Sequence, residues 1–254
     1  MKKHVVMSYL LEKLIGASFS ISIFFIILFI GSGFNLFEFQ DTVKVPALWM
    51  IFFGYGIISS LVIDFIGKFM RPFSFVKQLL LYILFGYLIF VVMMSIEFVL
   101  IAGTVGALFS FLFLLGKEKL KPSKWYSWLV FAVPLACLAM MPFDHTSKVG
   151  WHELVGDSSV EVEYDYFNGE HLIPIHGAQG EKIYFVVKHQ ISGDDSYGYG
   201  VTVYDEGSDY AGMNDEGGDV ISVEFEEESI KYIAVRVTDG KQGRFQVKWW
   251  SEES

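Results

Sequence analysis

The sequence predicts a membrane protein in which a five-span α-helical bundle is followed by a C-terminal all-β antiparallel sandwich domain outside the cytoplasm. Three observations predict this: long apolar blocks fill residues 1–143, strict apolar–polar alternation fills residues 159–254, and the charge changes sign between them. Residues 1–143 contain 11 Lys or Arg against 6 Asp or Glu, a net charge of +5, whereas residues 144–254 contain 8 against 23, a net charge of −15. This asymmetry indicates two regions in different solvents.

Each apolar block is judged against a hydrocarbon core of about 30 Å. The first block is longer than the ~7–15 residues of a signal-peptide core and no A-x-A cleavage pattern follows it, so we expect an uncleaved span. The block 78–116 would be about 58 Å long as one helix, so we divide it at 94–98, "MSIEF". The last block begins with a cluster of Trp and Tyr and contains Pro134, which can kink it. The expected spans are 14–34, 45–66, 78–94, 98–116 and 125–143.

The positive-inside rule orients these spans. Dividing the third block places the basic loops 67–77 and 117–124 on the same side as Lys2, Lys3 and Lys13, which is the cytoplasm. Five spans then place residues 144–254 outside the cytoplasm, with 144–158 as a linker. We therefore expect a multi-pass protein of the bacterial cell membrane whose lipid partner is the bilayer.

The spans contain few residues that could support chemistry. Asp64 lies one turn before Lys68 near the end of its span, which predicts an interfacial ion pair. Ala102, Gly106 and Ser110 share one helix face, with Gly103 and Ala107 beside it, and small residues in this pattern predict close helix packing. The sequence contains neither HExxH nor G-x-S-x-G, so we expect no enzyme, no catalytic residue and no cofactor.

The C-terminal half alternates with a period of two residues, which is typical of half-buried strands separated by Gly, Asp and Asn turns. We expect six strands of this kind, and a seventh at "HLIPI" is a further option. The nonpolar residues that should share the inner face are Val160, Val162, Tyr164, Tyr166, Ile183, Phe185, Val187, Tyr199, Val201, Val203, Ile221, Val223, Phe225, Ile233, Val235, Val237, Phe245, Val247 and Trp249.

Residues 181–250 resemble the bacterial pre-peptidase C-terminal type of β-sandwich. The similarity lies in "YFVV", "VTVYDE", an acidic loop, "ISVEF" and "YIAVRVTDGKQGRFQVKW" as a closing hairpin. Domains of that family are usually accessory modules, so the resemblance implies binding or support rather than catalysis. The membrane half resembles no family.

The stretch 204–220, "YDEGSDYAGMNDEGGDV", contains six carboxylates and no basic residue. Asp205, Asp209, Asp215 and Asp219 are candidate calcium ligands, but their spacing does not follow an EF-hand loop, so a solvated acidic loop is the default interpretation. The histidines at 145, 152, 171, 176 and 189 do not form a zinc pattern, and the single cysteine, Cys137, lies in an apolar block.

These features leave three classes of function. We expect an envelope protein that presents a non-catalytic extracytoplasmic β-sandwich for binding, sensing or complex assembly, with a membrane or envelope protein as partner. The alternative is a transporter or channel subunit with the sandwich as an external cap, which the scarcity of buried charge disfavours. An enzyme is least supported. Nucleic acid is disfavoured as a partner because a half with a net charge of −15 repels phosphates.

Overall fold

The computed structural model describes residues 2–70, 73–93, 95–191, 198–207 and 209–251. The chain divides into two compact units, Met1–Phe143 and Asp144–Ser254, referred to below as the helical unit and the β unit. The stretch 192–195, "SGDD", which is one of the Gly- and Asp-containing turns expected between strands, and Ser208 of the acidic stretch lie outside the described residues.

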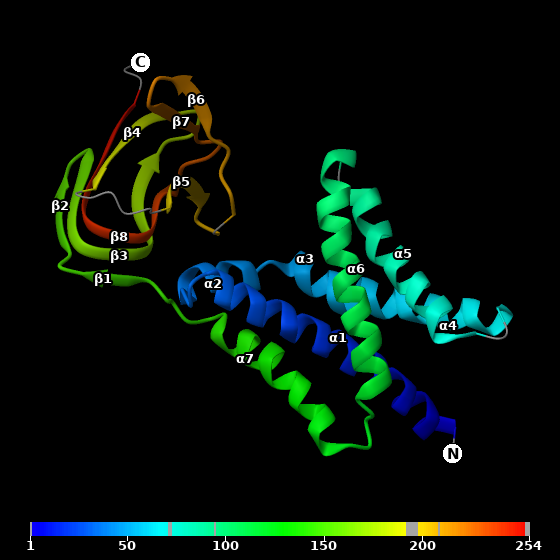
Figure 1. The fold of residues 1–254 in the computed structure, drawn as a ribbon. Helices are drawn as coiled ribbons and strands as arrows, with labels where there is room; N and C mark the ends of the chain where they lie inside the picture. The colour runs from blue at the N-terminus through cyan, green and yellow to red at the C-terminus, as the bar shows by residue number, and fades with distance from the viewer. Residues whose placement is uncertain (1, 71–72, 94, 192–197, 208, 252–254) are drawn as a thin grey trace. The chain divides into compact units, whose positions relative to one another are not determined.

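The helical unit contains four helices that are long and apolar enough to cross a membrane: Val6–Gly31, Pro46–Phe69, Phe75–Met93 and Ile96–Lys119. A further apolar helix, Trp125–Met140, is shorter. The expected division of the third block is confirmed, because one helix ends at Met93 and the next begins at Ile96. The elements are α1 (Lys2–Gly31), α2 (Leu36–Val43), α3 (Pro46–Trp49), the π-helix η1 (Met50–Tyr55), α4 (Gly56–Phe69), α5 (Phe75–Met93), α6 (Ile96–Lys119), the 3-10 helix η2 (Trp125–Phe131) and α7 (Ala132–Met140) (Figure 1).

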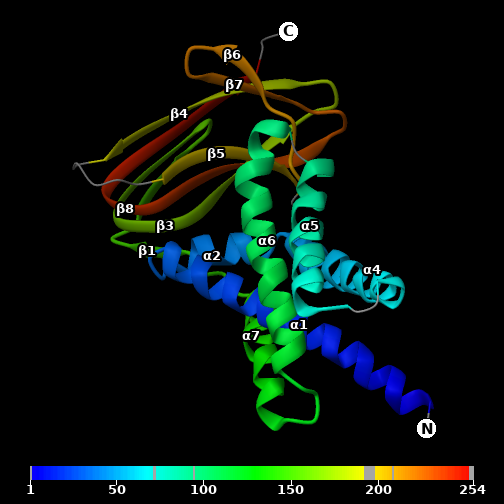
Figure 2. The ribbon, with the colours of Figure 1, turned by 45° about the vertical axis from the view of Figure 1, so that its right-hand side comes forward.

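Helices α5 and α6 form an antiparallel pair that runs side by side in both ribbon views (Figures 1 and 2). A Cβ atom added to Gly86 of α5 would stand 2.7 Å from the Cα of Ala107 and from the carbonyl oxygen of Gly106, so the two backbones are in contact. Gly103 in turn makes room for the ring of Tyr87. The prediction that the small residues of α6 serve close packing is confirmed at these positions.

A proline explains one contact between α1 and the last helix. Pro134 has no backbone N–H, so the carbonyl oxygen of Val130, four residues earlier, lacks its helical donor. The buried Ser22 hydroxyl of α1 donates to this oxygen at 2.9 Å. At the other end of α7, the buried Gln40 side chain on α2 places its Nε2 within 3.1, 3.0 and 2.5 Å of the carbonyl oxygens of Met140, Met141 and Phe143. The Ser22 contact supplies a donor in place of the one that Pro134 lacks, and Gln40 adds a donor to the carbonyls at the end of the last helix, of which that of Met140 also accepts from the Phe143 N–H.

The β unit is one antiparallel sheet with the strand order β1-β3-β8-β4-β7-β6, in which β2 also pairs with β3 and β5 also pairs with β8. The segment 144–158, expected to be a linker, contributes β1 and β2, which pair with β3. The strands are β1 (Ser147–Val149), β2 (His152–Gly156), β3 (Ser159–Gly177), β4 (Lys182–Ile191), β5 (Gly198–Asp205), β6 (Asn214–Gly217), β7 (Val220–Glu224) and β8 (Ser229–Ser251).

Strands β3 and β8 are long, curved and paired over most of their length (Figures 1 and 2). The expected closing hairpin at "DGKQG" is wrong, because both sides of this segment continue to pair with β3. Asp239 and Gln242 have φ of 53° and 48°, which bends β8 there without reversing it. A Cβ atom added to Gly243 would meet the Tyr164 hydroxyl at 2.4 Å, so the bend brings the β8 backbone against a core side chain.

The curvature lets the sheet enclose a single hydrophobic core to which both halves of β8 contribute. Most of the residues expected to face inward are buried, but Tyr166 is half-buried and Tyr199 is 41% exposed. In β3 the buried positions change from even to odd numbers between Tyr164 and Phe167, and the register with β8 shifts just after this, between Phe167 and Gly169. Phe167 is buried in place of Tyr166, whose hydroxyl instead donates to Asp239 Oδ1 at 2.7 Å at the surface.

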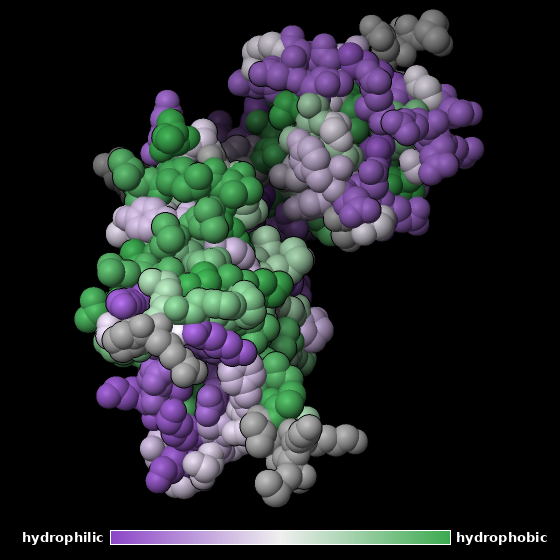
Figure 3. Space-filling view, turned by 90° about the vertical axis from the view of Figure 1, so that its right-hand side faces the viewer, coloured by the Kyte–Doolittle hydropathy of each residue, from purple (hydrophilic) through white to green (hydrophobic). Residues whose placement is uncertain are grey.

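The two units differ in what they expose. Large apolar side chains of α1, α4, α5 and α6 are exposed, and they cover much of the visible face of the helical unit, with hydrophilic side chains gathered toward one end (Figure 3). The visible face of the β unit is mainly hydrophilic. Apolar helix surfaces of this kind are stable in a hydrocarbon solvent, which indicates a membrane protein.

Candidate functional site

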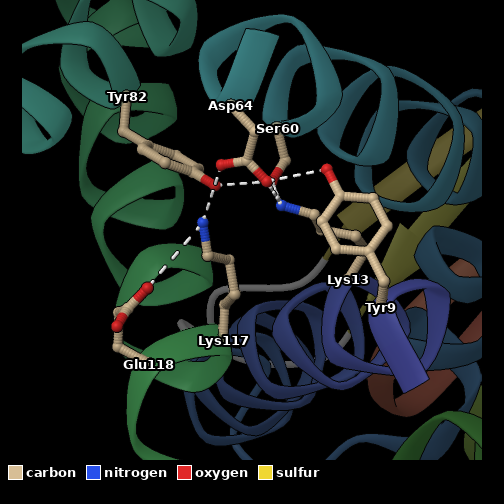
Figure 4. Close-up of polar contacts among 7 residues, drawn as sticks. All are labelled: Tyr9, Lys13, Ser60, Asp64, Tyr82, Lys117 and Glu118. Atoms are coloured by element: carbon tan, nitrogen blue, oxygen red, sulfur yellow. Dashed lines mark hydrogen bonds and ion pairs between the residues drawn. The ribbon is translucent and has the colours of Figure 1, made fainter. Parts of the chain in front are cut away.

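The helical unit contains a polar cluster made by four helices (Figure 4). Its members are hydroxyl-bearing or charged side chains that are far apart in the sequence and meet within the helical unit. We call it the Asp64 cluster. It consists of Tyr9 and Lys13 from α1, Ser60 and Asp64 from α4, Tyr82 from α5, and Lys117 and Glu118 from α6.

Asp64 lies at the centre of this cluster and is held from two sides. Its Oδ2 accepts hydrogen bonds from the Tyr9 hydroxyl at 2.8 Å and from the Lys13 ammonium. Its Oδ1 accepts a hydrogen bond from Lys117 Nζ at 3.1 Å. One carboxylate therefore neutralises part of the charge of two lysines while linking α1, α4 and α6.

Tyr82 and Ser60 extend the cluster to α5. The two hydroxyl oxygens are 2.5 Å apart, and Lys13 Nζ donates to Ser60 Oγ at 2.9 Å. Lys117 Nζ lies 5.6 Å from the centroid of the Tyr82 ring, within the range of a cation–π interaction.

Burial explains why these groups are paired. The side chain of Lys13 is 1% exposed, that of Lys117 is 8% exposed and that of Asp64 is 22% exposed. A buried charge without a partner is strongly unfavourable, whereas a hydrogen-bonded ion pair is tolerated. Because two lysines share Asp64, the carboxylate is the member whose loss leaves the most charge unpaired.

The expected ion pair between Asp64 and Lys68 is replaced by these contacts. Lys68 is exposed near the end of α4, and the described ion-pair partners of Asp64 are Lys13 and Lys117, which lie 51 and 53 residues away in the sequence. The sequence does carry one signal of this cluster: Ser60 and Asp64 are four residues apart and share a face of an apolar helix. Proximity along the chain favoured Lys68, but tertiary packing brings the two distant lysines closer.

The cluster lies near one end of the four long helices. Lys117 is two residues from the end of α6 and Asp64 is five residues from the end of α4, which at 1.5 Å per residue is within about 10 Å of both helix ends. This depth corresponds to the interfacial edge of a membrane rather than its centre. The geometry suits an ion-pair network that fastens four helices together.

An apolar cavity of about 370 Å³ begins at Tyr82 and extends away from the cluster between η1–α4 on one side and α5–α6 on the other. Ile51, Phe52 and Tyr55 of the π-helix form part of its wall. π-Helical segments within α-helices are frequent at functional sites. The cavity and the Asp64 cluster share Tyr82, whose ring lines the cavity and whose hydroxyl belongs to the cluster.

The four candidate calcium ligands lie at different places in the β unit. Asp205 ends β5 and pairs with Lys231, and the Asp209 carbonyl accepts from the Asp205 N–H at 2.9 Å in the turn that follows. Asp215 lies in β6, where its Oδ1 accepts from the Gly217 N–H at 2.9 Å, and Asp219 lies in the turn before β7. Among the described residues, no group of three or more Asp, Glu, His or Cys side chains could hold a metal ion.

The acidic stretch is partly ordered by the sheet rather than being one open loop. The Ala211 N–H donates to the Val203 carbonyl at 2.9 Å and the side chain of Ala211 is buried, so the chain returns along β5 before β6 begins. A hollow of about 620 Å³ beside this turn is lined by carboxylates, including Glu206, Glu224 and Glu226, and by Lys231.

Two histidines of the β unit are half-buried and hydrogen-bonded. The Nε2 of His189 lies 2.8 Å from the Tyr164 hydroxyl, and burial lowers the pKa of His189 to about 4. The Nδ1 of His171 lies 3.0 Å from Lys148 Nζ; burial, and then the Lys148 charge, lower the pKa of His171. Both imidazoles are therefore neutral at pH 7 and serve the packing of the β unit.

The chain matches no family model and no curated protein sequence. The resemblance of residues 181–250 to a pre-peptidase C-terminal domain therefore stays a prediction.

Proposed function

We propose that this is an integral protein of the bacterial cell membrane whose helical unit anchors the β unit outside the cytoplasm as a non-catalytic module for binding, sensing or complex assembly. The observation that carries the proposal is the division into two compact units with opposite surfaces. One unit exposes apolar helices suited to lipid, and the other closes its own hydrophobic core and belongs to the acidic half of the chain.

The fifth span of this proposal is the helix Trp125–Met140. Its first seven residues are 3-10 helix, which rises about 2.0 Å per residue, so the 16 residues reach about 27 Å instead of the 24 Å of a pure α-helix. That length is close to the hydrocarbon thickness of about 30 Å. The contact of Ser22 with the carbonyl freed by Pro134 supports the same assignment, because it satisfies a backbone group that lipid cannot.

The orientation proposed is N-terminus in the cytoplasm and β unit outside. The helix ends and connections near the Asp64 cluster carry basic residues, namely Lys68, Lys77, Lys119, Lys121 and Lys124. The positive-inside rule favours the cytoplasm for that end. With five spans the chain then leaves the membrane on the opposite side after residue 143.

A transport component is the second candidate, favoured by the cavity beside the Asp64 cluster. Against it, the Asp, Glu and Lys residues of the four long spans all lie near helix ends, and the cavity wall is apolar. A path for ions or polar solutes needs polar groups at the membrane centre. The anchoring role therefore fits the distribution of charge better.

Cysteine accessibility tests the orientation. In a Cys137→Ser background, single cysteines at Ser158 and Ser251 should react with an impermeant maleimide on intact cells or spheroplasts, and a cysteine at Ser123 should react only after permeabilisation. Labelling of the cysteine at position 123 in intact cells would refute the topology. The same labelling pattern at positions 123 and 158 would also refute it, because it would place both on one side of the membrane and leave four spans.

A comparison of two chains tests the role of the β unit. The full-length protein and a chain ending after Phe143 are each crosslinked in native membranes and purified. An envelope protein captured only by the full-length chain supports the proposal. Capture of the same protein by both chains would assign binding to the membrane spans. If the full-length protein captures no partner and conducts solute in reconstituted vesicles, transport would be favoured.

A further inference from the structure

We propose that the cavity between η1–α4 and α5–α6 holds one acyl chain of an anionic phospholipid from the leaflet next to the Asp64 cluster. The inference rests on the membrane insertion proposed above and is independent of what the β unit binds. Four features of the cavity carry it: its wall chemistry, its length, its polar end at Tyr82 and the charge of the neighbouring helix ends.

The wall of the cavity is mostly hydrocarbon, and the hydroxyls of Ser20, Tyr55 and Tyr82 are used within the protein, whereas the buried Ser59 Oγ has no hydrogen-bond partner among the described residues. The Ser20 hydroxyl donates to the Phe109 carbonyl at 2.8 Å, and the Tyr55 hydroxyl donates to the Phe85 carbonyl at 2.5 Å. Tyr82 shares a hydrogen bond with Ser60. An occupant therefore meets apolar rings and aliphatic side chains, which match an alkyl chain and not a polar solute.

The length of the cavity matches the depth of one leaflet. Along α6 its lining extends from Ala102 to Phe113, 11 residues or about 16 Å at 1.5 Å per residue. Half of a hydrocarbon core of about 30 Å is about 15 Å. One acyl chain lying along the helices would fill this distance.

Charge selects the class of lipid. Tyr82 lies at one end of the cavity and its hydroxyl belongs to the Asp64 cluster, so the head group of the bound lipid is placed at the adjoining helix ends. Those ends carry Lys68 on α4 and Lys77 on α5, both exposed. Basic side chains at a membrane surface attract anionic head groups, each contributing on the order of fivefold in binding.

Glycines and a π-helical turn contribute to the walls of the space. Gly86 and Gly106 let α5 and α6 pack in contact and both line the cavity, and the opposite wall includes part of the π-helical turn Met50–Tyr55. In a bilayer such a space is filled by lipid, because an empty cavity forfeits dispersion contacts.

Photocrosslinking tests the proposal with the full-length protein. It is reconstituted in vesicles of phosphatidylethanolamine and phosphatidylglycerol containing a trace of phosphatidylglycerol with a diazirine near the end of one acyl chain. After illumination, we expect adducts concentrated on cavity-lining peptides of α5 and α6. The same diazirine chain on phosphatidylcholine should label these peptides several-fold less, since it lacks the anionic head group.

Two variants of α6 provide the matched comparison. Ala102→Phe places a ring in the cavity, and Leu100→Phe places the same ring on the outer surface, where Leu100 is 73% exposed. Cavity labelling should fall roughly fivefold or more in Ala102→Phe and stay within twofold in Leu100→Phe, as expected if a ring displaces the chain. Gly56→Leu fills the space from the opposite wall, where an added Cβ would stand 3.5 Å from its nearest neighbours, and should give the same loss.

The outcomes separate this inference from the membrane proposal. Adducts spread evenly over the exposed faces, or unchanged in both cavity-filling variants, would overturn the acyl-chain site while leaving membrane insertion intact. Equal labelling by the two head groups would overturn the selection of anionic lipid. Absence of adducts from every span would instead refute membrane insertion itself.

Discussion

Replacement of Asp64 by asparagine tests how the four helices are held together. The substitution keeps the size of the side chain and removes the one negative charge that Lys13 and Lys117 share. Lys13 is then left with neutral acceptors only, Ser60 Oγ and the amide oxygen of the new asparagine, while its side chain is 1% exposed. We expect a large loss of stability from this single change.

The magnitude follows from the burial of the partners. Removing one member of a buried ion pair typically costs about 3–5 kcal/mol, because the other charge stays buried and unpaired. Lys13→Met should cost less, about 1–3 kcal/mol, since Asp64 keeps Lys117 and Tyr9 as partners. The double variant Lys13→Met/Asp64→Asn should be more stable than Asp64→Asn alone, because the stranded ammonium is gone.

Thermal unfolding of the full-length protein in detergent, followed by tryptophan fluorescence, measures these effects. A loss of 3–5 kcal/mol should lower the apparent Tm of the helical unit on the order of 10 °C. Lys68→Met is the matched control: it removes the exposed lysine nearest to Asp64 in sequence and should leave the Tm within about 1 °C. An unchanged Tm in Asp64→Asn, or an equal drop in Lys68→Met, would refute the cluster.

Three further predictions concern packing and pH. The β unit expressed alone should unfold in one cooperative transition in urea titrations. Within it, Phe225→Asp should abolish folding because it buries a charge in the core, whereas Glu224→Lys, at an exposed position, should change the unfolding free energy by less than about 0.5 kcal/mol. Because burial lowers the pKa of His189 from 6.5 to about 4, its stabilisation is complete above pH 6.5 and is lost as the pH falls toward 4. From pH 7 to 5 this loss amounts to at most about 2 kcal/mol, because solvent partly screens the half-buried imidazole. His189→Gln should remove this contribution from the pH dependence of the unfolding free energy, and an unchanged slope would contradict the assignment. In the helical unit, Ser22→Ala should destabilise the protein by about 1 kcal/mol, but not in a Pro134→Ala background, where the helix supplies its own donor; equal effects in both backgrounds would show that the two residues are not coupled.

The sequence alone determined where the chain changes solvent and how each half is built. Runs of apolar residues and apolar–polar alternation are local properties, because each helix or strand meets its solvent over a window of neighbouring residues. The division of block 78–116 into two helices followed from the thickness of a bilayer, and the inner faces of most strands followed from their period of two.

The acidic stretch shows an intermediate case. Its composition predicted a turn region between two strands, and the structure has a turn after β5 and a hairpin from β6 to β7. The sequence could not show that Asp205 pairs with Lys231 or that Ala211 is buried, because both partners come from strands elsewhere in the sheet.

Only the tertiary structure decided the partners of Asp64 and the course of β8. Lys13 and Lys117 approach Asp64 because α1, α4 and α6 pack together, and no local periodicity specifies which of several distant lysines will do so. Gly240 and Gly243 indicate that the chain changes direction, but they are equally compatible with a hairpin and with a bend in a continuous strand. The bend prevails because β3 continues alongside both halves of β8, so the interstrand hydrogen bonds formed across the whole length determine the path that local turn propensity leaves open.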